Sequence, residues 1–250
     1  VVRAHGNGWR GGNTSKLTSN RPGGLHLSEI RAVTLDLDET MLDRRATFLL
    51  FIRSQVARFD RFFHDVDHDE FVNRVVELDR DGVTPKDEVF AGAARDFDLA
   101  DEAAQTLPRD FLNRFPDECV AFAQLDDVLG QLAESGYRLA VITNGSEEIQ
   151  QRKIDVMGIG PAFDYIAISE TVGVKKPDAE IFHHTLEHLG VAPEEAVHVG
   201  DNPRSDIMGG KEAGLRTIWT RSRRWPQGPG TDAVIEEIAQ LPEAIERLAV

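Results

Sequence analysis

The chain has 250 residues, of which 41% are hydrophobic, enough for one sizeable core and a smaller second one. Its 43 Asp and Glu against 28 Lys and Arg give a formal net charge of -15, which would repel nucleic-acid phosphates and acidic lipid surfaces. The single cysteine, Cys119, can form no disulfide within the chain, and no apolar run approaches the ~20 residues of a membrane span. We therefore expect a cytoplasmic monomer or homodimer that binds neither a nucleic acid polymer nor a membrane.

Residues 1–28 are rich in small and polar residues and lack an apolar period, so we expect a flexible N-terminal tail there. An apolar, strand-like run follows and ends in Asp36-Leu37-Asp38-Glu39-Thr40. Because side chains alternate along a strand, Asp36 and Asp38 leave it on the same side. Two carboxylates in one small volume repel each other, and a hard cation such as Mg²⁺ relieves that repulsion. The motif therefore predicts metal-assisted chemistry.

Residues 44–123 show only helical apolar periods, divided by turn signals at Asp81-Gly82 and Thr84-Pro85. This length of helix directly after the first strand predicts a separate helical subdomain over the carboxyl end of that strand. Its stretch of His, Asp and Glu at residues 64–70 invites a metal hypothesis, but it has no fixed ligand spacing. We interpret that stretch as a solvated helix start.

Strands and helices alternate from about residue 124 onward. We predict strands at residues 138–142, 165–169, 196–200 and 215–220, and helices at residues 125–134, 147–156, 179–189 and 205–213, with residues 232–250 as a last amphipathic helix. This order predicts an α/β fold with a mostly parallel sheet that is flanked by helices on both faces. Residues 29–43 and 124–250 would form this core, and residues 44–123 the inserted helical domain.

Polar residues follow several of these predicted strands at their carboxyl ends. In open parallel sheets, ligands bind just beyond these ends. The second strand ends in Thr143-Asn144-Gly145, a hydroxyl and backbone N–H groups suited to hold phosphate oxygens. Thr143 could also simply cap the next helix. The loop after the third strand carries Lys175 and Lys176, of which the position before Pro177 favours Lys176 for the site.

The fourth strand ends in Gly200-Asp201 and leads to Asp206. We predict that Asp201 binds the cation, whereas Asp206 caps its helix or orients Lys176 and so supports the site together with Thr40.

Together these groups meet the needs of phosphoryl transfer through an aspartyl-phosphate. Asp36 is the predicted nucleophile, and Lys176 with a cation would neutralise the developing negative charge. Asp38 would protonate the leaving oxygen and later deprotonate the water that hydrolyses the intermediate. Side-chain ligation by Asp36 and Asp201, with a backbone carbonyl from Asp38, fits the preferences of Mg²⁺.

The four motifs, Asp36 to Thr40, Thr143, Lys176 and Gly200-Asp201 through Asp206, resemble in this order those of the haloacid dehalogenase superfamily over roughly residues 30–220. The resemblance implies a Rossmann-like core, a Mg²⁺-dependent aspartate nucleophile and a mobile cap, and the helical insertion is similar to its class one cap. Glu39 stands where Gly or Asn is commoner.

Dehalogenases of this superfamily lack a carboxylate at the position of Asp38, so the resemblance favours a phosphatase. The residues around Lys176 and Asp201 resemble the branch that holds nucleotidases and acyl-sugar-acid phosphatases, which implies a small phosphorylated metabolite of the nucleotide or sugar phosphate type.

Three other functions compete with this interpretation. A phosphosugar mutase would use the same carboxylates but protect the aspartyl-phosphate from water. A signalling receiver domain also accepts phosphate on Asp, but it is about half this length and its acceptor lies mid-domain. A non-catalytic phosphate-binding protein would be expected to lack part of the catalytic set, and nothing essential is missing.

Overall fold

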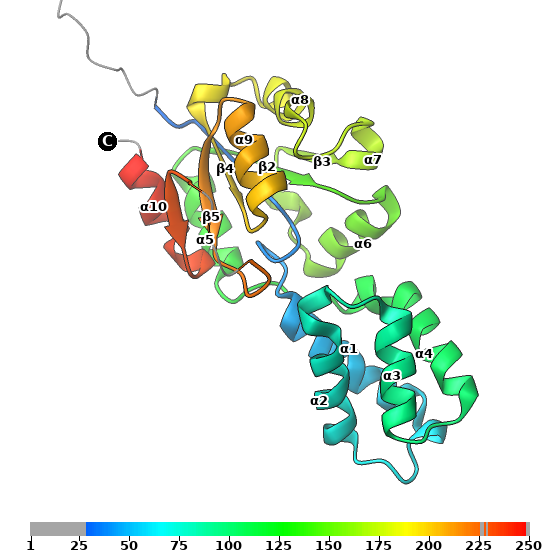
Figure 1. The fold of residues 1–250 in the computed structure, drawn as a ribbon. Coiled ribbons are helices and arrows are strands. Elements are labelled where there is room, and N and C mark those ends of the chain that lie inside the picture. The colour runs from blue at the N-terminus through cyan, green and yellow to red at the C-terminus, as the bar shows by residue number, and fades with distance from the viewer. Residues whose placement is uncertain (1–28, 226–227, 229, 249–250) are drawn as a thin grey trace, which may run out of the picture.

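The core of the protein is a six-stranded parallel sheet in the computed structural model, which describes residues 29–225, 228 and 230–248 (Figure 1). The strands are β1 (Ala32–Leu35), β2 (Arg138–Thr143), β3 (Tyr165–Ile168), β4 (Ala196–Gly200), β5 (Arg216–Thr220) and β6 (Ala233–Ile235). Their order is β3-β2-β1-β4-β5-β6, so the chain builds outward from β1 first to one edge and then to the other. The direction reverses between β1 and β4, where ligand-binding crevices form in such sheets. The predicted α/β class is confirmed, and the tail predicted for residues 1–28 lies outside the described residues.

Helices cover both faces of the sheet. On one face α5 (Leu125–Glu134) and α10 (Leu241–Leu248) pack in a cluster with Val33 and Leu35 of β1. On the other face α8 (Ala179–Leu189) packs in a second cluster with Ala32. β1 is therefore buried on both sides, and its one polar residue, Thr34, pairs with His198 of β4 at 2.8 Å.

The helical insertion has a hydrophobic core of its own. Its helices are α1 (Arg44–Arg58), α2 (His68–Asp79), α3 (Lys86–Asp96) and α4 (Asp101–Arg114), and Figure 1 shows them set apart from the sheet. Phe111 packs edge-on against Phe48 and Phe51, with ring centroids 5.9 and 5.3 Å apart, and fourteen buried side chains join this cluster. This cluster is distinct from the two that cover the faces of the sheet. In the described ranges, no helix is long and apolar enough to cross a bilayer.

The stretch of residues 64–70 is a helix start, as interpreted from the sequence. Asp67 caps α2 by accepting a hydrogen bond of 2.9 Å from the backbone N–H of Glu70. No group of metal-ligating side chains occurs there within the part of the chain that the structure describes.

The C-terminal segment differs from its prediction as one helix. It contains β6, which pairs with β5, then a short 3-10 turn at Ile238–Gln240, and only then α10. The prediction was wrong because β6 has only three residues and alternates a half-exposed Val234 with a buried Ile235, too short a pattern to show a strand period.

The turn after β1 explains the departure at Glu39. Its φ of 64° lies in the left-handed region, where Gly and Asn are favoured and other residues carry steric strain. We expect Glu39→Asn to raise the free energy of unfolding by about 0.5–1 kcal/mol, because Asn tolerates this backbone conformation better. Urea denaturation would measure the change, and a lower midpoint for the variant would contradict the strain argument.

Candidate active site

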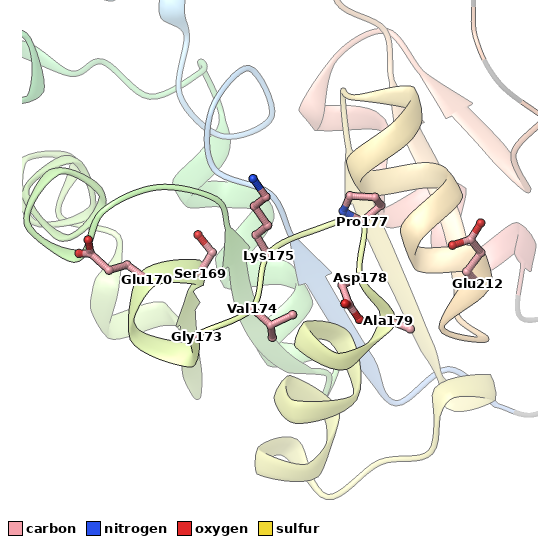
Figure 2. A pocket seen from close by; sticks show the side chains of 9 residues that line it. All are labelled: Ser169, Glu170, Gly173, Val174, Lys175, Pro177, Asp178, Ala179 and Glu212. Atoms are coloured by element: carbon pink, nitrogen blue, oxygen red, sulfur yellow. The ribbon is translucent and has the colours of Figure 1, made fainter.

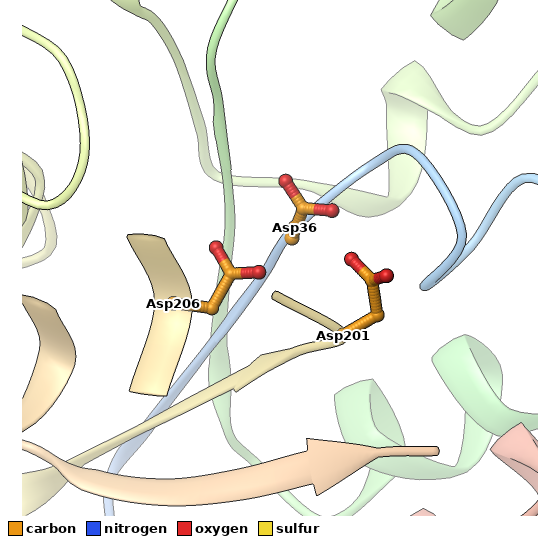
Figure 3. A group of neighbouring side chains, drawn as sticks. All are labelled: Asp36, Asp201 and Asp206. Carbon is orange, nitrogen blue, oxygen red and sulfur yellow. The ribbon is translucent and has the colours of Figure 1, made fainter. Parts of the chain in front are cut away.

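Three carboxylates converge at the carboxyl ends of β1 and β4 (Figure 3). Asp36 directly follows β1, Asp201 directly follows β4, and Asp206 lies on a π-helical turn, Pro203–Met208. One oxygen from each side chain lies within 4.8 Å of the others, and all three residues are buried. The approach depends on Gly200, because a Cβ there would come within 2.4 Å of the Asp206 side chain. The sequence placed all three residues at this end of the sheet, and the structure brings them together.

Lys176 is in direct contact with two of these carboxylates, those of Asp36 and Asp206. Its Nζ lies 2.6 Å from Asp36 Oδ1 and 2.7 Å from Asp206 Oδ1, and it donates to the carbonyl of Ile142 at 2.6 Å. Lys175 instead lines a separate, open hollow of about 790 Å³ that contains none of the three carboxylates (Figure 2). The structure thus places Lys176, and not Lys175, beside Asp36 and Asp206, while the roles of Lys176 and Asp206 stay predictions.

The charges of this cluster do not balance. Burial raises the pKa of Asp36 to about 7, although Lys176 opposes the shift, and burial together with the charge of Asp36 raises the pKa of Asp201 to about 8. Burial also acts against ionisation of Asp206, but the Lys176 ammonium outweighs it and holds the pKa of Asp206 below its usual range. When ionised, three carboxylates against one lysine leave two negative charges, which matches one divalent cation.

The free oxygens indicate which carboxylates fit such a cation. Both carboxylate oxygens of Asp206 already have partners, since Oδ1 contacts Lys176 and Oδ2 accepts a hydrogen bond of 2.8 Å from the backbone N–H of Asn202. Asp201 accepts from Ser222 Oγ at 3.0 Å, and Asp36 accepts from Thr40 Oγ1 at 3.3 Å. Each of these two carboxylates keeps acceptor capacity for a hard cation. Thr40 thus contacts Asp36, and its supporting role stays a prediction.

Asp38 is held by two residues that the sequence analysis did not assign. Lys153 Nζ lies 2.8 Å from both carboxylate oxygens of Asp38, and Gln150 Nε2 donates to Oδ2 at 3.1 Å. Gln150 also donates to Thr143 Oγ1 at 2.5 Å, which links Asp38 to the end of β2. Both residues lie on α6 (Glu147–Met157), three positions apart and hence on one face of the helix. This spacing is the signal in the sequence that could have indicated a shared role.

We expect Lys153→Met to lower kcat about tenfold to a hundredfold with a smaller change in KM. The variant removes two charge-assisted hydrogen bonds that orient Asp38, a loss of about 1–3 kcal/mol. Steady-state kinetics with p-nitrophenyl phosphate would measure the split between kcat and KM. Arg152→Met, one residue away on α6 and paired with Asp117 at 2.7 Å, is the matched control. A Lys153→Met variant with the kcat of the control would contradict the positioning role.

The segment after β2 meets its predictions only in part. Thr143 is not the cap of α6, since the cap position is Ser146 and the Thr143 hydroxyl accepts from Gln150. Asn144 exchanges two hydrogen bonds of 2.9 Å with the backbone of Lys176 and so positions that lysine. The Gly145 N–H donates to Ser169 Oγ at 3.0 Å, so the expected phosphate contact from Gly145 is not supported.

A cavity of about 410 Å³ opens above these residues between the sheet and the helical insertion. The core side presents Asp36, Asp38, Asp201, Thr143, Asn144 and Lys176. The helical side contributes Arg44, Lys86, Phe111 and Phe115, and the loop after β5 contributes Arg224 and Trp225. A small ligand in this cavity would touch both parts of the protein.

The family model described as haloacid dehalogenase-like hydrolase matches residues 33–220, which contain every motif of the site. The chain belongs to this family. Among relatives of this hydrolase, a glyceraldehyde 3-phosphate phosphatase of Pyrococcus furiosus is 28% identical over 88% of this chain and 95% of its own length. A phosphoserine phosphatase of Thermus thermophilus is 34% identical over 58% of this chain and 57% of its own length. These names agree with the predicted enzyme class, a phosphoric monoester hydrolase.

A solved structure shares the fold of this hydrolase. YfnB, a hydrolase of the same superfamily from Bacillus subtilis that was solved bound to magnesium, superposes with a TM-score of 0.63. It is 21% identical and covers 87% of this chain and 99% of its own. The Rossmann-like core predicted from the resemblance is thereby confirmed.

Proposed function

We propose that this hydrolase is a Mg²⁺-dependent phosphatase that cleaves a small phosphorylated metabolite through an aspartyl-phosphate on Asp36. The observation that carries the proposal is the pairing of Asp36 with Lys176 at 2.6 Å, beside Asp201 and in the same cavity as Asp38. A nucleophilic carboxylate, a fixed cation and a second carboxylate for proton transfer are the groups that this chemistry needs.

The protein groups act in two steps in this proposal. Asp36 attacks phosphorus while the bond to the leaving oxygen breaks, and Asp38 donates a proton to that oxygen. Asp38 then takes a proton from water, which attacks phosphorus, releases orthophosphate and restores the Asp36 carboxylate. Lys176 holds Asp36 and offsets the negative charge of the transferring group in both steps.

Mg²⁺ belongs at Asp36 and Asp201, with the backbone carbonyl of Asp38 as the third expected ligand. When bound there, it supplies positive charge against the repulsion between the carboxylate nucleophile and the phosphate dianion. The fit rests on the two unbalanced charges of the buried cluster and on the free oxygens of Asp36 and Asp201.

The helical insertion, residues 44–123, acts in this proposal as the cap that selects the substrate. Four of its side chains line the cavity opposite the catalytic residues, so the part of the substrate that is not transferred would contact them. Relatives named for glyceraldehyde 3-phosphate, phosphoserine and pyrophosphate support a small substrate of this kind.

A product assay tests the proposal against its nearest rival. The purified chain with Mg²⁺ is expected to release orthophosphate from p-nitrophenyl phosphate and from members of a panel of nucleotides, sugar phosphates, phosphoserine, glyceraldehyde 3-phosphate and pyrophosphate. Isomerised sugar phosphate without orthophosphate would indicate a phosphosugar mutase instead. A folded protein that releases no orthophosphate from any compound would overturn the hydrolase mechanism.

A further inference from the structure

Two cations on the helical side of the cavity share a single buried carboxylate. Arg44 Nη1 and Nη2 lie 3.0 and 3.4 Å from the oxygens of Asp79, and Lys86 Nζ is bonded to the same carboxylate. The Asp79 side chain is 2% exposed, and those of Arg44 and Lys86 are 16% exposed. Arg44 opens α1, Lys86 opens α3 and Asp79 ends α2, so three separate helices build this group.

Aromatic rings hold the two cations in place. Lys86 Nζ lies 5.5 Å from the ring centroid of Phe111 and 5.7 Å from that of Phe48, and the Arg44 guanidinium lies 5.5 Å from the Phe48 centroid. Cations placed over aromatic faces and tied to a buried carboxylate lose little further freedom when a ligand binds. The group is therefore preorganised.

The group of Arg44, Lys86 and Asp79 has a net positive charge. One carboxylate balances one cation, so Arg44, Lys86 and Asp79 together keep one positive charge. Donors also remain, because Lys86 uses two of its three N–H groups on Asp79 and the carbonyl of Thr84. Glu39 lines the same cavity from the core and interacts with the charge of Arg44 at longer range, but no ion pair within 4.0 Å joins Glu39 to Arg44 or Lys86 among the described residues.

We infer that Arg44 and Lys86 bind a second anionic group of the substrate, a carboxylate or another phosphate, across the cavity from Asp36. The inference rests on the proposed function, since it assumes that the phosphate to be cleaved lies at Asp36. It makes these two residues determinants of specificity and narrows the substrate class to compact metabolites with two anionic ends.

Competitive inhibition of p-nitrophenyl phosphate hydrolysis tests this inference with matched pairs of probes. 3-Phosphoglycerate carries a carboxylate where glycerol 3-phosphate carries a hydroxymethyl group, and fructose 1,6-bisphosphate carries one phosphate more than fructose 6-phosphate. We expect the inhibition constant of the more anionic member to be at least about tenfold lower in at least one pair. The reason is that its second anionic group can accept a charge-assisted hydrogen bond from Arg44 or Lys86, which the less anionic member cannot do.

Variants then assign the preference to the two cations. Lys86→Met and Arg44→Met are each expected to reduce that ratio about tenfold, whereas Arg53→Met is expected to preserve it. Arg53 lies on the same helix as Arg44, is 61% exposed and pairs with Asp69 away from the cavity. Thermal unfolding would show whether each variant folds. If a variant does not fold, the ratios measured for the wild-type protein still test whether a second anion is bound.

Two failures remain distinguishable. Ratios near one in both wild-type pairs, with p-nitrophenyl phosphate still hydrolysed, would overturn the second-anion site and leave the phosphatase intact. No hydrolysis of p-nitrophenyl phosphate at all would overturn the proposed function itself.

Discussion

Replacing Asp36 with Asn is expected to lower kcat for p-nitrophenyl phosphate by at least ~10³-fold and to leave the fold intact. The amide cannot form the acyl phosphate, and the neighbouring carboxylates have other partners, since Asp206 is bound to Lys176, Asp38 to Lys153 and Asp201 to Ser222. The shape of the side chain is conserved, so Asn can still accept a hydrogen bond from Lys176 through its carbonyl oxygen and donate one to Thr40 Oγ1 through its amide nitrogen. Steady-state kinetics and thermal unfolding of the same preparation would measure both effects.

The matched control is Asp65→Asn, an exposed aspartate of the helical insertion that does not line the cavity. It should retain the wild-type kcat. Undiminished turnover in Asp36→Asn would remove Asp36 as the nucleophile and with it the aspartyl-phosphate mechanism. Lost turnover accompanied by lost cooperative unfolding would point to a structural role for Asp36 instead.

Much of the core could be predicted because its signals are local. The helix predicted at residues 125–134 has those bounds in the structure, since its apolar residues recur with a helical period and it ends beside a Gly. The buried strands stand out as short apolar runs, and the alternation of elements leads directly to the parallel sheet. The edge strand β6 was missed because three residues carry almost no periodic information.

The positions of the carboxylates in the candidate site could be predicted because each one follows a strand. Strand ends meet at one edge of a parallel sheet, so the sequence order of Asp36 and Asp201 is enough to place them together. Lys153 could not be assigned in the same way, because a lysine within a polar helix resembles any solvated charge. Only its contact with Asp38, in the turn after β1, distinguishes it.

The shared carboxylate at Asp79 was still harder to foresee. Arg44, Asp79 and Lys86 belong to three helices whose relative packing no local pattern encodes, and each residue alone resembles a surface charge. A specificity site built in this way depends on the tertiary arrangement of the insertion. This explains why the sequence predicts the reaction better than it predicts the substrate.

Removal of Mg²⁺ is expected to abolish turnover and to make the protein less stable as the pH rises from about 5 to 8. The sign follows from the two raised carboxyl groups, since the pKa values of Asp36 and Asp201 lie at about 7 and 8 in the folded protein. In an unfolded chain the same carboxyl groups have pKa values near 4. Between about pH 4 and pH 8 the folded state therefore binds more protons than the unfolded state. The free energy of unfolding consequently falls as the pH rises through this range.

Mg²⁺ should reverse this loss, because it binds the ionised carboxylates and replaces the dissociated protons. At a hundred times its Kd a ligand adds about 2.7 kcal/mol, which corresponds to a rise in Tm of roughly 5–10 °C for a chain of this size. The rise should be larger at pH 8 than at pH 6, where protons compete for the same oxygens, and Asp201→Asn should show less of it. Equal Tm values with and without Mg²⁺ at both pH values would mean that the buried carboxylates are balanced by the protein alone, and the metal would then lose its structural justification.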